Sequence, residues 1–305
     1  MTQPYNPALH RFALFVASCT LLLLVAGALV TSNDAALSVP DWPLSYGTVT
    51  PPMVGGIIYE HSHRVIAATV GLLTILLAAW LWLKDERSSV RWLGVAALGA
   101  VIAQGALGGM TVLFTLRYGF PVEHACLAQL FFCVTITLAL FTSRWWQSDL
   151  PRVEDSGSPS IHLLAGLTVA ATFLQVIFGA LFRHKQSNIV PHLLGAGLVA
   201  AMVIWTAAIL RRRFGNVTAI VRVRILLHSL LGIQLILGGA TWWSRLSTAN
   251  APQPMPVMVT LTVMHTVFGA LTLAGALLVV LVCSRLVERG REAALAGHPE
   301  GAALS

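Results

Sequence analysis

The sequence predicts an all-α integral membrane protein whose eight transmembrane helices form two pseudo-symmetric four-helix bundles. Composition, the spacing of apolar stretches and an internal repeat support this fold class. Of the 305 residues, 56% are hydrophobic and only 10% are charged, whereas a soluble domain carries roughly 25% charged residues. Apolar stretches of about 20 residues, long enough to cross a hydrocarbon core of about 30 Å, recur along the chain. We expect helices at 12–31, 61–83, 92–114, 123–142, 161–182, 191–210, 224–243 and 258–284.

These helices leave no room for a separate soluble domain. The N-terminal half, residues 1–150, contains helices 1–4; the C-terminal half, residues 151–285, contains helices 5–8; and residues 286–305 form a polar tail. The stretch at 12–31 is of spanning length and no small-residue cleavage site is evident before Asp34, so we expect a retained helix. Every cysteine falls within a predicted helix, where we interpret it as a small apolar residue and not a disulfide partner. The cysteines are Cys19, Cys126, Cys133 and Cys283.

The basic residues predict how the chain is oriented in the lipid bilayer. With the N-terminus placed in the cytoplasm, the inner side receives fourteen Lys and Arg residues and the outer side four, while Arg64 lies at the head of the second helix. This positive-inside bias predicts that both termini are cytoplasmic. It also accounts for the net charge of +7 without a nucleic-acid partner. The inner residues are Arg11, Lys84, Arg87, Arg91, Arg144, Arg152, Arg211, Arg212, Arg213, Arg222, Arg224, Arg285, Arg289 and Arg291, and the outer ones are Arg117, Arg183, Lys185 and Arg245.

The outer ends of the odd-numbered helices repeat a common pattern. Residues 104–111 read QGALGGMT and residues 234–241 read QLILGGAT, while 175–181 (QVIFGAL) and 27–31 (GALVT) are weaker copies. After each copy comes an outer loop and then an even-numbered helix with a histidine in its first turns. The repeating unit is therefore a helix hairpin that occurs four times. It predicts two halves that are related by a pseudo-symmetry axis along the membrane normal.

Four of the ten histidines occupy equivalent positions in this repeat, and each is expected within about two turns of the outer end of its helix. An ionisable side chain inside a membrane is costly and is retained with a partner or a function. Imidazole is a common axial ligand of haem iron, and helix bundles build cofactor sites from side chains on facing helices. We therefore expect each half to hold haem iron between two histidines. They are His63, His124, His192 and His265.

The start of the second helix carries further candidates. His61 is about 200° around the helix from His63, so the two cannot bind one iron. Glu60 lies three residues before His63 and shares its helix face. One interpretation pairs Glu60 with Arg64 in an i,i+4 ion pair worth about 0.3–0.5 kcal/mol; the other places a carboxyl group beside a reacting haem, where it handles protons or orients substrate. His184, in an outer loop, is either a contact for a ligand carboxylate or a solvated residue.

The segment before this helix carries a resemblance to a known family. The loop at residues 32–60 is the longest outer segment, and its prolines predict an ordered cap at the membrane surface. Residues 40–44 read Pro-Asp-Trp-Pro-Leu and residues 60–64 read Glu-His-Ser-His-Arg. This loop, the ExxHR motif that follows it, the eight-helix span with its two homologous halves and the four histidines are similar to those of the haem A synthase family over residues 12–285.

The resemblance implies an oxidoreductase of the cell membrane that oxidises the methyl group of haem O to the formyl group of haem A by successive hydroxylations, supplying a terminal oxidase. It implies haem b as a cofactor on His192 and His265, and substrate haem O near Glu60 on His63 and His124. An external electron donor and the haem O-producing farnesyltransferase are the implied partners. Arg64 is a candidate for binding a haem propionate, as are three other outer arginines, which are equally suited to snorkel to lipid headgroups. These are Arg117, Arg183 and Arg245.

One feature departs from the family, and two other functions stay open. Some members carry a cysteine pair in outer loops; here Ser38, Val39 and Ser45 stand in the first loop, so thiol chemistry there is not expected. A non-catalytic di-haem electron carrier of b type would use the same four histidines but would not need Glu60. A transporter would fit the repeats, yet it predicts ionisable residues or helix breaks near mid-membrane, which the sequence lacks.

Overall fold

The computed structural model describes residues 5–115 and 119–290, and these are almost entirely helical. Arg117 and the chain beyond residue 290 lie outside the described ranges. The elements, in chain order, are α1 (Pro7–Ser32), α2 (Gly56–Lys84), α3 (Ser88–Leu113), α4 (Phe120–Phe141), α5 (Arg144–Gln147), β1 (Val153–Asp155), α6 (Ile161–Arg183), α7 (Val190–Phe214), α8 (Thr218–Ser247), α9 (Pro256–Leu286) and β2 (Val287–Arg289).

Eight of these helices, of 22 to 31 residues, are long and apolar enough to span a membrane, which confirms the predicted all-α multi-pass fold. Their bounds are wider than the apolar stretches. Helix α8, for example, covers Thr218–Ser247 where 224–243 was predicted, because the helix continues beyond the hydrocarbon into polar residues such as Arg222 and Arg245. Helices α4, α7 and α9 carry proline in their first turn, where a missing backbone N–H costs no intrahelical hydrogen bond.

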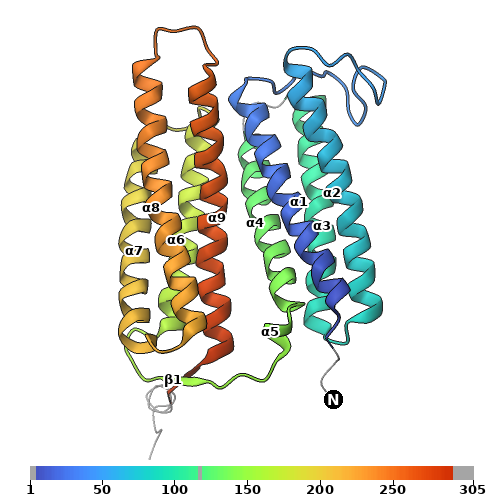
Figure 1. Ribbon diagram of the computed structural model, residues 1–305. Coiled ribbons are helices and arrows are strands. Elements are labelled where there is room, and N and C mark those ends of the chain that lie inside the picture. Colours follow the sequence, from blue (N-terminus) through green and yellow to red (C-terminus); the bar gives the residue numbers. More distant parts are fainter. Residues whose placement is uncertain (1–4, 116–118, 291–305) are drawn as a thin grey trace, which may run out of the picture.

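The helices form two groups of four that lie side by side (Figure 1). In the first group α1 and α3 each contact both α2 and α4; in the second, α6 and α8 each contact both α7 and α9. The two halves therefore share one cyclic order of helices. Helix α9 contacts α1 and α4, and α4 contacts α6, so these helices join the halves. We refer to the end of the molecule with the α1–α2 loop as the loop end, and to the other as the linker end.

Each half has its own apolar core. Buried Leu, Val and Phe side chains such as Leu77 and Phe131 fill the first half, and others such as Leu210 and Leu227 fill the second. Between the halves lie only small clusters, for example Ala28 with Val259 and Val263. Many large apolar side chains stay exposed on the outer faces, as expected where lipid and not water surrounds the helices.

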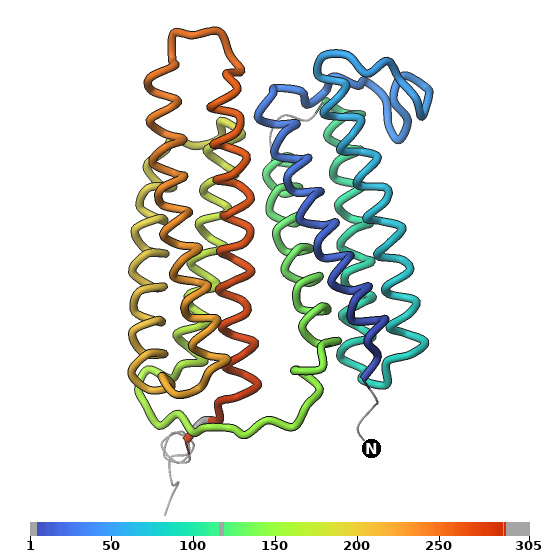
Figure 2. Tube along the Cα trace, in the orientation of Figure 1, coloured from blue at the N-terminus to red at the C-terminus, as the bar shows by residue number. Residues whose placement is uncertain are grey.

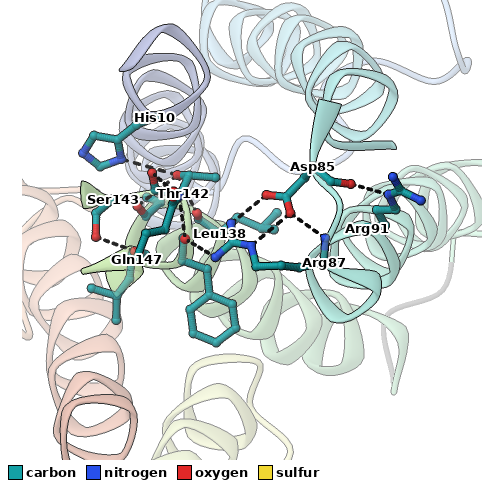
Figure 3. A network of polar contacts seen from close by, with 11 residues as sticks. His10, Asp85, Arg87, Arg91, Leu138, Thr142, Ser143 and Gln147 are labelled. Atoms are coloured by element: carbon teal, nitrogen blue, oxygen red, sulfur yellow. Dashed lines mark hydrogen bonds and ion pairs between the residues drawn. The ribbon is translucent and has the colours of Figure 1, made fainter. Parts of the chain in front are cut away.

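A polar network closes the linker end of the first half (Figure 3). The Arg87 guanidinium forms two hydrogen bonds with the Asp85 carboxylate, of 2.9 and 2.6 Å, and a third with the carbonyl oxygen of Phe141 at 2.9 Å. His10 Nδ1 lies 3.3 Å from the Thr142 hydroxyl. The network thus ties the α2–α3 turn and α1 to the end of α4.

The linker between the halves runs along the same end (Figure 2) and contains two short strands that the sequence did not predict. Strand β1 pairs in parallel with β2, which follows α9. Asp155, at the end of β1, is buried; its Oδ2 accepts the Ile161 N–H at 2.7 Å and its Oδ1 lies 3.1 Å from Nη1 of Arg213. One carboxylate therefore links the strand, the start of α6 and the end of α7.

Replacing Asp155 is expected to destabilise the second half. Asp155→Ala removes a buried carboxylate and leaves the Ile161 N–H and the Arg213 guanidinium without it, which should cost about 3 kcal/mol of unfolding free energy. Thermal or denaturant unfolding of the purified protein measures it. The matched control is Glu288→Ala, which removes the exposed Arg152–Glu288 pair and should cost less than about 1 kcal/mol. Equal losses in the two variants would contradict the role of Asp155.

Candidate functional site

The four repeat histidines lie near the loop end, on the helices that start there (Figure 1). His63, His124 and His192 fall within the first two turns or so of α2, α4 and α7, whereas His265 lies nine residues after the first residue of α9. Within the second half, α8 and α9 extend further at this end than α6 and α7 do (Figure 1), so His265 lies deeper in its helix than His192 does. All four side chains are partly buried.

Each imidazole ring packs against a glycine of the preceding helix. A Cβ placed on Gly27 would lie 3.3 Å from Cε1 of His63, and one on Gly238 would lie 3.0 Å from Cε1 of His265. In the other two hairpins, a Cβ on Gly108 would lie 3.4 Å from Cε1 of His124, and one on Gly179 would lie 3.1 Å from Cε1 of His192. The repeat glycines therefore make room for the imidazoles.

The two histidines of the second half face each other closely. The ring centroids of His192 and His265 are 6.1 Å apart and the ring planes are inclined by 84°. A metal–imidazole bond is about 2 Å long and the nitrogen lies roughly 1 Å from the ring centroid, so imidazoles on opposite sides of one metal have centroids roughly 6 Å apart. This pair is spaced as the two axial ligands of one iron would be.

Aromatic and basic side chains surround this pair. Phe182 stacks on His192 with ring centroids 6.4 Å apart and an angle of 13°. Trp242 packs against Phe182, and the Arg245 guanidinium carbon lies 5.4 Å from the Phe182 ring centroid. Arg245 is thus the predicted outer arginine that the structure brings close to the second pair of histidines.

His63 and His124 lie on α2 and α4, and both of these helices pack against α1 and α3. The Nδ1 atoms of His63, His124 and His265 are all buried and have no hydrogen-bond partner. Among the residues that the structure describes, no group of three or more His, Cys, Asp or Glu side chains could hold a metal ion. The spacing of His192 and His265 is compatible with two imidazoles that would hold one haem iron, so these two residues fit haem.

The α1–α2 loop is fastened to the start of α2 by two charged side chains. Arg64 pairs with Glu60 at 2.7 Å and donates to the carbonyl oxygens of Asp41 and Leu44 at 2.6 and 2.7 Å. The other oxygen of Glu60 accepts the Val39 N–H at 3.0 Å. The predicted i,i+4 ion pair between Glu60 and Arg64 is therefore present. Both side chains also bind the backbone of the α1–α2 loop, and so they attach this loop to α2 one turn before His63.

The loop is also ordered from within, as its prolines and tryptophan predicted. The Asp41 carboxylate accepts the N–H groups of Gly47 and Tyr46, both at 2.7 Å. The hydrogen bond from Gly47, followed by that from Tyr46, holds the pKa of Asp41 below its usual range. The Trp42 indole packs directly on Gly109, where a Cβ would come within 2.8 Å of the ring. Trp42 thus connects the loop to α3, next to the glycine that contacts His124.

Other candidates have different surroundings. His61 hydrogen-bonds the Ser45 hydroxyl at 2.9 Å, so it serves the loop and is separate from the His63 pair. Arg183 donates to Ser32 Oγ at 2.7 Å and to the Ala28 carbonyl, which ties α6 to α1 across the two halves. His184 follows α6; burial, and then the neighbouring Arg183, lower its pKa to about 4.

Sequence reasoning missed the glutamines of the repeat. Gln104 and Gln175 donate through Nε2 to the backbone oxygens of His124 and His192, at 3.1 and 2.9 Å. The sequence does contain a signal for these residues, because glutamine is the first residue in three of the four repeat copies. We had assigned a function only to the histidines of the repeat.

The fold and the site define a class: a multi-pass α-helical membrane protein in which each four-helix half places two imidazoles near one end. Residues 53–298 match the COX15-CtaA family model, described as cytochrome oxidase assembly protein. The chain belongs to this family.

Several curated relatives are similar to the chain. Proteins named heme A synthase from Bacillus licheniformis and Symbiobacterium thermophilum are each 27% identical to it, over 60% and 68% of this chain and over 61% and 78% of their own lengths. One of the same name from Shouchella clausii is 35% identical over 38% of this chain and 42% of its own. The chain thus spans about six tenths of the length of the first of these relatives.

Proposed function

We propose that this protein is a haem A synthase, which oxidises the methyl group of haem O to the formyl group of haem A by successive hydroxylations with O₂ and external electrons. Family membership and the name carried by the similar proteins support this activity. The observation that carries the proposal at the site is the asymmetry of the two halves. Both have a histidine pair, but within residues 5–115 and 119–290 only the first half has a buried carboxylate and a fastened loop one turn away.

The proposed division of labour follows from that asymmetry. The C-terminal half, residues 151–285, holds a resident haem b between His192 and His265, which is supported by the 6.1 Å ring spacing. The N-terminal half, residues 1–150, holds substrate haem O on His63 and His124 beneath the loop. When bound, the resident haem supplies one-electron chemistry.

The residues of the first half have distinct proposed roles. His63 and His124 bind and orient the substrate porphyrin. Glu60 holds a proton-accepting carboxylate one turn from His63, and with Arg64 it keeps the loop closed, so that water is excluded from the site. Arg64 is a weaker candidate for a propionate than the sequence suggested, because Asp41, Leu44 and Glu60 already engage its guanidinium. Arg245 is better placed for that contact in the second half.

The proposed location is the plasma membrane, with both termini in the cytoplasm and the loop end at the outer face. The excess of Lys and Arg on the linker side supports this orientation. The proposed partners are an external electron donor and the haem O-producing farnesyltransferase, since haem O is too apolar to cross water freely.

Conversion of haem O tests the activity. The chain is expressed with a source of haem O, and the extracted haems are separated by chromatography and weighed by mass spectrometry. We expect haem A with the unchanged protein and none with His63→Ala. Complete persistence of haem O in a folded, haem-loaded preparation supplied with electrons would overturn the proposal and favour the non-catalytic di-haem carrier.

A further inference from the structure

Three of the four helix hairpins contain a half-buried glutamine next to their histidine. Each glutamine lies four residues before the glycine that accommodates the imidazole, so it sits one helical turn from the ring. The three glutamines are Gln104, Gln175 and Gln234. In each of them the Oε1 atom is buried and has no hydrogen-bond partner.

The amide groups reach the histidine-bearing helix. Nε2 of Gln104 donates to the His124 carbonyl oxygen at 3.1 Å. Nε2 of Gln175 donates to the His192 carbonyl oxygen at 2.9 Å and lies 3.0 Å from Nδ1 of the same residue. A hydrogen bond between helices fixes both the depth and the rotation of one helix against the other. These two contacts therefore fix where each imidazole lies.

The third glutamine makes the loosest of the three contacts. Nε2 of Gln234 lies 3.5 Å from Nε2 of His265. Gly269, one turn after His265, leaves room for this amide, since a Cβ there would lie 3.3 Å from Nε2 of Gln234. The second half thus has a glutamine beside both of its histidines.

The first hairpin breaks the pattern. The position four residues before Gly27 is Leu23, whose side chain has no hydrogen-bonding group and packs with the apolar core of the first half. The start of α2 is tied instead to the α1–α2 loop through Glu60 and Arg64. The position of His63 therefore depends on the loop, whereas the other three imidazoles are held from within the bundle.

We infer that Gln104, Gln175 and Gln234 are positioning residues for three haem-ligating histidines, and that His63, which has Leu23 instead, is the ligand that moves when a porphyrin enters or leaves. This inference rests on the proposed function. An imidazole that binds iron through Nε2 carries its proton on Nδ1 and needs an acceptor there. The Gln175 amide lies 3.0 Å from Nδ1 of His192, the ring nitrogen that would face away from an iron bound at Nε2.

Retention of the resident haem tests the inference on the full-length protein. Gln175→Met and Gln234→Met keep the side-chain length but remove the amide. Loss of haem to apomyoglobin should become about 10–100-fold faster, the usual cost of losing a second-shell partner, and the haem midpoint potential should shift. Gln129→Met is the matched control: Gln129 is also buried with a partnerless Oε1, but it lies outside the repeat pattern, so haem loss and potential should stay unchanged.

Faster haem loss in the glutamine variants could also result from misfolding, so a variant with the opposite expected effect is needed. Leu23→Gln restores the missing glutamine and should slow exchange of added haem in the first half by about tenfold. Unchanged haem loss and potential in Gln175→Met and Gln234→Met, or unchanged exchange in Leu23→Gln, would overturn the inference. A haem-loaded chain that makes no haem A but responds in these assays would overturn the proposed activity alone, whereas a chain that binds no haem would overturn both.

Discussion

His265→Ala is expected to remove the resident haem b spectrum from the purified protein, and His192→Ala should do the same. Each variant leaves a single imidazole where two with centroids 6.1 Å apart could hold one iron. Losing even a second-shell partner costs about 10–100-fold in metal affinity, so losing an axial ligand should reduce bound haem to less than about a tenth of normal. Reduced-minus-oxidised spectra and pyridine haemochrome content measure the loss.

Two variants control for this prediction. His63→Ala changes the other half and should leave the resident spectrum in place, and His61→Ala removes a histidine that hydrogen-bonds only within the loop region, to Ser45. If His265→Ala kept the spectrum while His63→Ala lost it, the assignment of resident and substrate haem to the two halves would be reversed.

The helix count followed from sequence because it depends on local patterns. Apolar stretches of spanning length must become helices in lipid, where each backbone N–H and C=O needs a partner within its own segment. The hairpin repeat then placed His124 and His192 at matching positions. Helix ends were less accurate, as at α8, because residues outside the hydrocarbon are not required to be apolar.

Contacts between distant segments could not be read in this way. Nothing local indicates that Trp42 packs on Gly109 of α3, or that the linker strand β1 pairs with β2 after α9. The Glu60–Arg64 pair was one of two open interpretations, and its i,i+4 spacing made it foreseeable. The additional role of that pair in fastening the loop required the folded chain, because Val39 lies 21 residues from Glu60.

Glu60→Gln is expected to lower haem A formation by about 100-fold or more while haem O stays bound. Glutamine keeps the size of the side chain and one acceptor oxygen, which can accept either the Val39 N–H or the Arg64 guanidinium but not both, so part of the loop's attachment is retained. It loses the carboxylate, and removal of a general acid–base group costs about 10²–10⁴ in rate. Single-turnover haem A formation, measured beside haem O content, checks this prediction.

A second pair of variants separates proton handling by Glu60 from its fastening of the loop. Asp41→Asn weakens the hydrogen bonds from Gly47 and Tyr46 that order the loop but leaves Glu60 intact, so it should speed haem O release with a smaller loss of rate. Arg64→Leu leaves the Glu60 carboxylate buried without its cation and should cost about 3 kcal/mol of stability. Wild-type turnover in Glu60→Gln, with rates falling only in Asp41→Asn and Arg64→Leu, would reduce Glu60 to a fastening residue. The carboxylate would then matter for when the loop opens and not for the chemistry beneath it.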